Sequence, residues 1–136
     1  MNKINAIFAS IFFIFMLFMS IFSKELHEKN LPHVTILKVE KKDFICNFID
    51  ENGDSYSVKR RAIGIPKYID KNNIYIVNED KVYGEQRYFA QKTEVFLENE
   101  YYSDDYYAVS LGLNVGDKVI LTSTIPLINN TEIIIK

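Results

Sequence analysis

An uncharged, strongly apolar run near the N-terminus constrains this chain more than any other feature. It spans residues 4–23 and reads INAIFASIFFIFMLFMSIFS, with Lys3 before it and Lys24 after it. A helix rises about 1.5 Å per residue, so the run can cross most of a hydrocarbon layer about 30 Å thick. It has no polar face, which disfavours a buried helix of a soluble domain. The sequence therefore predicts a hydrophobic helix that belongs in a membrane.

Two interpretations of this run remain open. In the first it is a signal peptide, and Ser23 is the last residue before the cleavage site. In the second it is an uncleaved anchor that crosses the membrane with residues 4–22, keeps Lys3 inside and places the chain from Lys24 onward outside. Under both interpretations we expect an exported protein, either periplasmic or extracellular, or anchored in the cytoplasmic membrane with its C-terminal domain outside.

The remaining residues divide into a short polar segment and one domain. Residues 24–31 (KELHEKNL) are polar and without a pattern, which predicts a tether. From residue 32 to residue 136, short alternating segments are separated by turn residues about every ten positions. All nine tyrosines follow Lys24, and tyrosine suits a half-buried sheet. We therefore expect a mainly β fold, a single small β-barrel or β-sandwich domain behind an N-terminal hydrophobic helix.

The expected strands follow from this alternation. Asn52-Gly53 predicts a β-hairpin with a type I′ turn, because both central residues of that turn need a positive φ. Polar turns are also expected at residues 40–43 and 78–80. Besides the returning strand around Tyr56, the expected strands are residues 34–39, 44–49, 74–77, 82–90, 94–97, 106–111, 118–123 and 132–135.

The side chains that most often carry catalysis or bind metals do not form a recognisable site. His27 and His33, the only histidines, lie in or beside the tether, where too few ligands are at hand for zinc. Segment 50–54 alternates Asp, Asn and Asp as calcium loops do, but Ser55 stands where such a loop needs glycine. No serine or cysteine lies in a nucleophile motif. We expect no catalytic residue, no cofactor and no metal, and hence a protein that is not an enzyme.

The charged residues and the single cysteine give no reason to expect a nucleic-acid partner or a disulfide. The net charge is −2, which is ordinary for a soluble surface. Lys59-Arg60-Arg61 is interpreted as a solvated strand edge that discourages unwanted pairing, with lipid headgroups as the alternative contact. Cys46 lies between Phe44 and Phe48 in an alternating segment, so we expect it to be a small buried side chain.

One segment is unusually rich in tyrosine. Residues 98–107 read ENEYYSDDYY, so four tyrosines are interleaved with four carboxylates. Aromatic residues among charges are typical of protein interfaces. The candidate partner surface is therefore Tyr101, Tyr102, Tyr106 and Tyr107. In the alternative interpretation, alternate tyrosines pack inward on strands and residues 104–105 form the turn between those strands.

The C-terminal half resembles the last domain of periplasmic adaptor proteins, also called membrane fusion proteins. Residues 110–121 (SLGLNVGDKVIL) and 126–135 (PLINNTEIII) are similar to its Gly-Leu, Gly-Asp-x-Val strand, turn and hydrophobic final strand. Upstream, Ile65-Pro66, residues 74–77 (IYIV) and residues 80–82 (DKV) resemble its proline-containing strand, its apolar strand and the hairpin that follows. The resemblance covers about residues 63–135.

This resemblance implies a β-rich, membrane-proximal module that packs beside an inner-membrane transporter and has no catalytic residue. The family also carries a lipoyl-like domain and an α-helical hairpin, for which 136 residues leave no room. The first hypothesis is therefore an extracytoplasmic, non-enzymatic accessory or interaction module associated with a membrane transport or envelope complex. The second is a secreted protein that binds a small ligand or glycan with residues 101–107. A mature N-terminus at Met1 favours the first hypothesis, and one at Lys24 favours the second.

Overall fold

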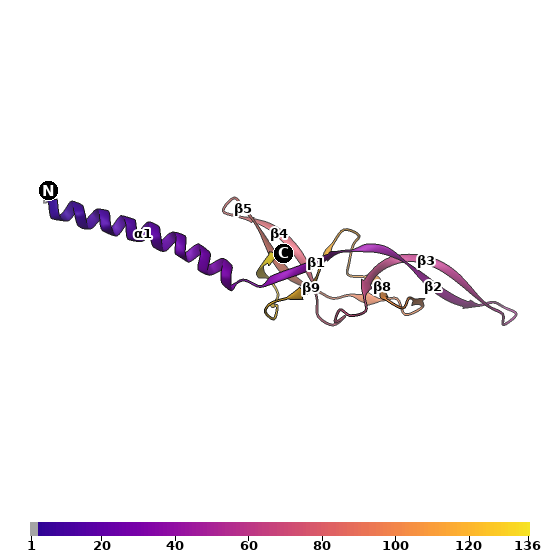
Figure 1. Cartoon of the computed structure of the whole chain (residues 1–136). Helices are drawn as coiled ribbons and strands as arrows, with labels where there is room; N and C mark the ends of the chain where they lie inside the picture. The colour runs from indigo at the N-terminus through magenta and orange to yellow at the C-terminus, as the bar shows by residue number, and fades with distance from the viewer. Residues whose placement is uncertain (1–2) are drawn as a thin grey trace. The chain divides into compact units, whose positions relative to one another are not determined.

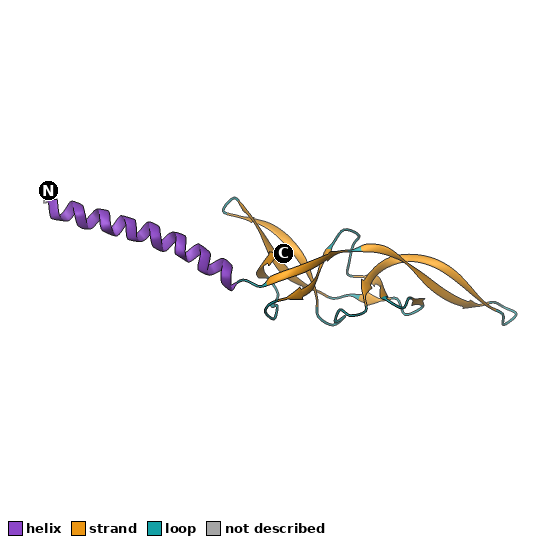
Figure 2. Cartoon of the chain, in the orientation of Figure 1, coloured by secondary structure: helices purple, strands orange, loops and turns teal. Residues whose placement is uncertain are grey.

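A computed structural model describes residues 3–136 and confirms the mainly β class with an apolar helix before the sheets (Figure 1). The chain divides into two compact units, residues 1–31 and residues 32–136. Figure 2 shows one helix in the first unit and strands with connecting loops in the second. Each unit is described by itself below.

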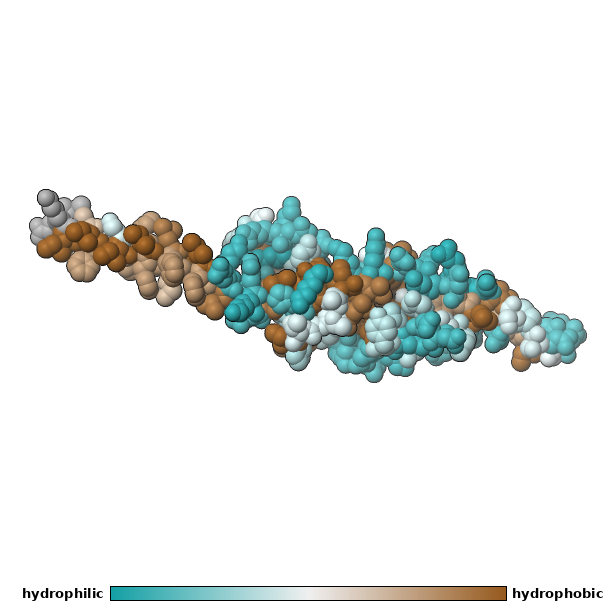
Figure 3. All heavy atoms as spheres, in the orientation of Figure 1, coloured by the Kyte–Doolittle hydropathy of each residue, from teal (hydrophilic) through white to brown (hydrophobic). Residues whose placement is uncertain are grey.

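The first unit is the helix α1, which spans Lys3–Asn30. Its apolar side chains from residue 4 to residue 22 are exposed, and Figure 3 shows them along the helix surface. Ser10 donates its hydroxyl to the carbonyl of Ala6 at 3.0 Å, which satisfies the polar group within the helix. Among the described residues, α1 alone is long and apolar enough to cross a membrane. An exposed surface of this kind needs lipid or protein to cover it.

The helix continues through residues 24–30, which belong to the segment predicted from the sequence as a short polar tether. Lys, Glu and Leu are good helix formers, so these residues prolong a helix that the apolar run has already started. His27 and Lys29 lie in the last turn, where a positive charge is favoured by the helix dipole. The helix ends before Pro32, whose ring disfavours a helical residue in front of it. Residues 24–30 of the tether are thus helical, and Leu31 lies outside the helix.

The second unit contains a ring of five strands that pair in a closed cycle. Four of the pairs are antiparallel, and the fifth joins the first and last strands of the unit in parallel. One of the five pairings in this cycle is very short, because its register contains a single residue pair, Ile76 opposite Val119. Inside the ring lie the buried side chains Val34, Ala90, Ile120 and Ile133. In ring order the strands are β1 (His33–Lys38), β10 (Thr131–Ile135), β5 (Glu85–Thr93), β4 (Ile74–Val82) and β9 (Lys118–Ser123).

The other five strands form an antiparallel sheet beside the ring. Its two edge strands have only two residues each, while the central hairpin is long. In sheet order the strands are β6 (Phe96–Leu97), β8 (Tyr106–Leu111), β3 (Ser55–Pro66), β2 (Glu40–Ile49) and β7 (Tyr101–Tyr102). A core cluster takes Ile65 and Val109 from the sheet and Ile74 and Val119 from the ring. This shared core makes residues 32–136 one compact unit.

The chain passes from the ring to the sheet at one buried residue, Val39, and not through the polar turn predicted at residues 40–43. The Val39 amide donates to the carbonyl of Asp117 at 2.7 Å, and its carbonyl accepts from the amide of Gly116 at 2.9 Å. Residues 40–43 instead begin β2 and pair with residues 61–64 of β3. The predicted turn is absent because the chain changes sheets at Val39 alone. The backbone of Val39 is bonded to residues 116–117, so no polar turn is needed there.

Two predicted turns also differ from the structure. Residues 78–80 lie inside β4, and the hairpin to β5 turns at Tyr83-Gly84, whose φ values of 52° and 82° suit a type I′ turn. The hairpin between β2 and β3 is confirmed, with Ile49 opposite Ser55. Its turn type was wrong, because Gly53 has a positive φ of 85° and Asn52 does not. The side chain of Asp50 explains this loop, since it accepts the amides of Asn52 and Asp54 at 2.9 and 2.8 Å.

Candidate functional site

The tyrosine-rich segment folds as β7, a short turn and the start of β8. Residues 101–102 pair with Ile45 and Cys46 of β2, and residues 106–107 pair with Ile65 and Pro66 of β3. The turn expected at residues 104–105 is present between the two strands. The structure separates the roles of the four candidate tyrosines. Tyr101 is half-buried with its ring centroid 6.2 Å from that of Phe44, and Tyr107 is half-buried against the core cluster, so these two tyrosines pack inward as the alternative interpretation expected.

The other three candidate tyrosines lie beside lysines that the sequence did not point to. Lys67 Nζ is 5.4 Å from the ring centroid of Tyr102 and 5.7 Å from that of Tyr107. Lys71 Nζ is 5.7 Å from the Tyr107 centroid, and Lys42 Nζ is 5.3 Å from the Tyr106 centroid. These distances are within the range of cation–π contacts. We call the group the tyrosine–lysine surface; it consists of Lys42, Lys67, Lys71, Tyr102, Tyr106 and Tyr107.

Two hollows meet at this surface, and Tyr106 lines both of them. The smaller has a volume of about 200 Å³ and is lined by Lys67, Lys71 and Glu98 together with the tyrosines. The larger has a volume of about 470 Å³ and lies between β1, β2, β3 and the start of β8. A partner that inserts a side chain into each hollow would therefore contact Tyr106 in both of them.

The charges on the tyrosine–lysine surface are mixed. The hydroxyl of Tyr102 donates to a carboxylate oxygen of Asp104 at 2.6 Å, and this hydrogen bond raises the pKa of Tyr102 above its usual value. Lys42 lies 3.5 Å from the carboxylate of Glu40. The surface therefore offers phenol hydroxyls, lysine side chains, carboxylates and aromatic faces. Such groups recognise a partner by hydrogen bonds, charge and packing.

The remaining candidate residues do not belong to this surface. His27 lies in α1, and His33 begins β1, where its backbone amide donates to the hydroxyl of Thr124 at 3.0 Å. Cys46 is buried with 1% of its surface exposed, which confirms that prediction. Lys59, Arg60 and Arg61 are exposed on β3. Within residues 3–136, no group of three or more His, Cys, Asp and Glu side chains could hold a metal ion.

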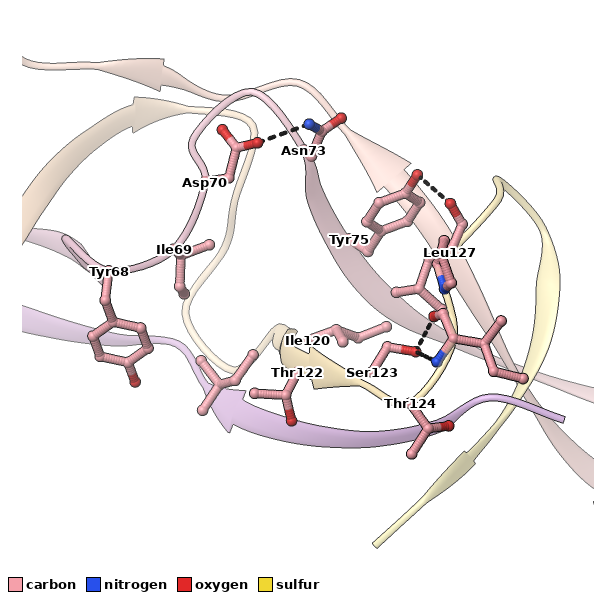
Figure 4. Close-up of a pocket in the computed structure, with 13 residues that line it drawn as sticks. Tyr68, Ile69, Asp70, Asn73, Tyr75, Ile120, Thr122, Ser123, Thr124 and Leu127 are labelled. Carbon is pink, nitrogen blue, oxygen red and sulfur yellow. Dashed lines mark hydrogen bonds between the residues drawn. The ribbon is translucent and has the colours of Figure 1, made fainter.

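A groove that the sequence did not predict lies between the 67–73 loop and β9 (Figure 4). Its volume is about 410 Å³, which is in the range of small-ligand sites. Several of its polar groups are already bonded within the protein. Asp70 accepts from the Asn73 side chain at 2.8 Å and from the Asn72 amide at 3.0 Å, and these bonds lower the pKa of Asp70. Tyr75 donates its hydroxyl to the carbonyl of Leu127 at 3.0 Å. These groups therefore stabilise the groove's walls.

Comparison of the chain with protein-family models, with curated proteins and with solved structures gives no match. The resemblance to periplasmic adaptor proteins therefore stays a prediction from residues 63–135. Residues 114–117 of that region form a turn. Gly116 has a φ of 97°, and the Asp117 carboxylate accepts the amide of Asn114 at 2.7 Å.

Proposed function

We propose that this protein is an exported, non-enzymatic interaction module that α1 holds at a membrane and that serves a transport or envelope complex. The apolar helix fits a signal peptide or a membrane anchor, which supports export. The adaptor-like residues 63–135 favour a partner in the same membrane. An uncleaved α1 would keep the β unit at the membrane surface, where such a partner is within reach.

The observation that carries this proposal is the tyrosine–lysine surface. Tyrosine gives a large contact area and loses little side-chain entropy, because it has only two rotatable side-chain bonds. Tyr102 is 58% exposed, although aromatic residues usually gain from burial. Lys67 and Lys71 lie over tyrosine rings, so their ammonium groups are placed before a partner arrives. Exposed, pre-positioned aromatic and cationic groups are typical of interface hot spots.

The test is co-purification from detergent-solubilised membranes of cells that produce the full chain. The variant combines Tyr102→Ala with Tyr106→Ala, and the matched control is Tyr83→Ala. Tyr83 is 99% exposed and lies in the turn between β4 and β5, away from the tyrosine–lysine surface in the sheet order. We expect the wild type and the control to retain the same membrane protein and the double variant to lose it. A wild-type chain recovered alone and freely soluble contradicts the proposal.

A secreted protein that binds a small ligand or glycan is the second candidate function, and the 410 Å³ groove is the observation that favours it. It is the weaker candidate because the polar atoms of Asp70, Tyr75 and Ser123 are already hydrogen-bonded to neighbouring groups of the protein. The mass of the mature chain separates the two functions. An N-terminus at Met1 supports the membrane-tethered module, and one at Lys24 supports the secreted binder.

A further inference from the structure

The chain enters the ring at the end where residues 124–130 connect β9 to β10. His33 begins β1, and its carbonyl accepts the amide of Thr124 at 3.0 Å. β10 starts at this end as well, because it runs parallel to β1 with His33 opposite Ile134. β9 runs antiparallel to β1 and therefore finishes here. We call residues 124–130 the entry loop, since they lie at the end of the ring that the chain reaches from α1.

The entry loop is uncharged and exposes apolar side chains. It reads TIPLINN, without an acidic or a basic residue. Ile125 is 45% exposed and Ile128 is 72% exposed, and Pro126 between them is exposed as well. Single exposed apolar side chains are common on soluble proteins, but three within four residues of an uncharged loop indicate a contact site. Because charged side chains are costly to place in lipid, an uncharged apolar loop suits a lipid surface.

Three backbone carbonyls of the entry loop already accept hydrogen bonds within the protein. They are those of Ile125, Leu127 and Ile128, and their donors are the Ser123 hydroxyl at 2.6 Å, the Tyr75 hydroxyl at 3.0 Å and the Thr131 amide at 3.1 Å. Figure 4 shows the bond between Tyr75 and Leu127. Pro126 has no amide hydrogen to satisfy. Moving a polar group out of water is most costly where that group has no partner. The bonded carbonyls therefore lower the cost of moving this loop from water into a lipid surface, while its isoleucines gain from the transfer.

The connection from α1 to the ring is too short to hold the entry loop far from a membrane that anchors α1. The exposed apolar run of α1 ends at Phe22, and the helix continues to Asn30, about 12 Å further along its axis. Leu31 alone separates the helix from Pro32, whose carbonyl accepts the amide of Ile134 at 2.9 Å. Whatever the angle between the two units, the chain therefore reaches the ring within about 20 Å of the hydrocarbon.

We propose that the entry loop docks on the surface of the lipid bilayer that holds α1 and inserts Ile125 and Ile128 between the headgroups. The inference rests on the proposed function, because it requires α1 to remain uncleaved. An anchored β unit stays close to the bilayer, and this proximity acts as a high effective concentration. Two isoleucines are then enough for docking, although they would bind a free domain only weakly. Docking holds the end of the ring that carries the entry loop against the membrane.

The experiment places the full chain in phosphatidylcholine vesicles and reads a fluorophore at Ile128→Cys. Nitroxide groups on lipids in the same vesicles quench a fluorophore that enters the headgroup layer. The matched control is Ile49→Cys, because Ile49 is also an exposed isoleucine, 77% exposed, and lies at the end of β2 in the sheet. Cys46 is 1% exposed, so the unsubstituted chain gives the labelling background. We expect the label at residue 128 to lose most of its emission and the label at residue 49 to keep it.

A second variant separates docking by the loop from insertion of the fluorophore itself. Ile125→Asp, added to the labelled Ile128→Cys chain, places a charge in the loop and should restore the emission. Quenching that survives Ile125→Asp overturns the proposal, because the label would then enter lipid without the loop. Flotation of the vesicles tests the anchor separately. A chain that floats with the vesicles but is quenched no more at residue 128 than at residue 49 overturns the docking and leaves the anchor standing. A chain that does not float overturns both.

Discussion

Replacing Gly112 by alanine should destabilise the β unit far more than the same change at Gly53. Gly112 follows β8 and has a φ of 101°, a conformation that an L side chain rarely adopts. An alanine Cβ would also overlap the carbonyl oxygen of Glu94 and lie 3.0 Å from the Cα of Val95. These atoms belong to the backbone and cannot rotate away. Gly53 has a similar φ of 85°, but a Cβ there meets nothing within 4 Å.

The magnitude follows from these two terms. A left-handed backbone costs an L-residue about 1–2 kcal/mol, and this cost applies to both glycines. Overlap with a fixed neighbour adds about 1–3 kcal/mol, and this cost applies only at Gly112. We therefore expect Gly112→Ala to lower the free energy of unfolding by about 2–5 kcal/mol and Gly53→Ala by about 1–2 kcal/mol. Both values count costs in the folded state alone, so the difference in free energy of unfolding between the two variants is the better-defined quantity.

Urea unfolding of the full chain in detergent, followed by tyrosine emission, measures this difference. The chain has no tryptophan, and all nine tyrosines lie after Lys24, so the signal reports the β unit and not α1. The slope of the free energy against urea should be the same for both variants. Equal losses of stability at Gly112 and Gly53 would refute the reasoning, because the close approach of Glu94 would then have no energetic consequence.

Two further predictions use the same assay. Phe44→Ala should lower the free energy of unfolding by about 3–5 kcal/mol, because Phe44 is 1% exposed. Ile45 is 44% exposed and lies on the opposite face of β2, so Ile45→Ala should lower it by about 1 kcal/mol or less. Equal losses at the two positions would contradict the packing. Glu79 accepts from Lys118 at 2.5 Å, and this bond lowers the pKa of Glu79 below its ordinary 4.5. The stability that the pair adds should therefore be present above pH 4.5 and be lost as the pH falls through the lowered pKa, so the wild type and Glu79→Gln should converge in acid. A difference that stays constant with pH would rule this out.

Local patterns in the sequence located most strands but could not say which strands pair. Residues 106–111 and 118–123 were predicted as strands and coincide with β8 and β9. Alternation shows that one face of a strand is buried, but it carries no information on the neighbour. The parallel pair of His33 with Ile134 joins residues 101 positions apart in the sequence and has no local signature. The cycle of five strands is complete only with such pairs between residues far apart in the sequence, as in His33 with Ile134 and Ile76 with Val119.

From the sequence, the tyrosines of the candidate site were predicted and its lysines were not. Composition pointed to Tyr102, Tyr106 and Tyr107, because a tyrosine-rich segment is visible in one stretch of sequence. The lysines of the tyrosine–lysine surface come from two other segments, β2 and the loop after β3. An isolated lysine in a loop has no pattern to distinguish it from a solvated one. Their positions beside the tyrosines are visible only when the sheet brings the three segments together.

The way the backbone holds these segments bears on how the tyrosine–lysine surface can work. Pro66 pairs with Tyr106 at the end of the β3–β8 ladder, and the amide of Lys67 donates to the carbonyl of Asp105 at 2.9 Å. The loop that carries the lysines is therefore bonded to the turn between the tyrosine strands. One residue before Pro66, Ile65 is fully buried in the core that the ring and the sheet share. Because these positions are fixed by backbone bonds and core packing, a partner would spend little of its binding free energy on ordering the surface.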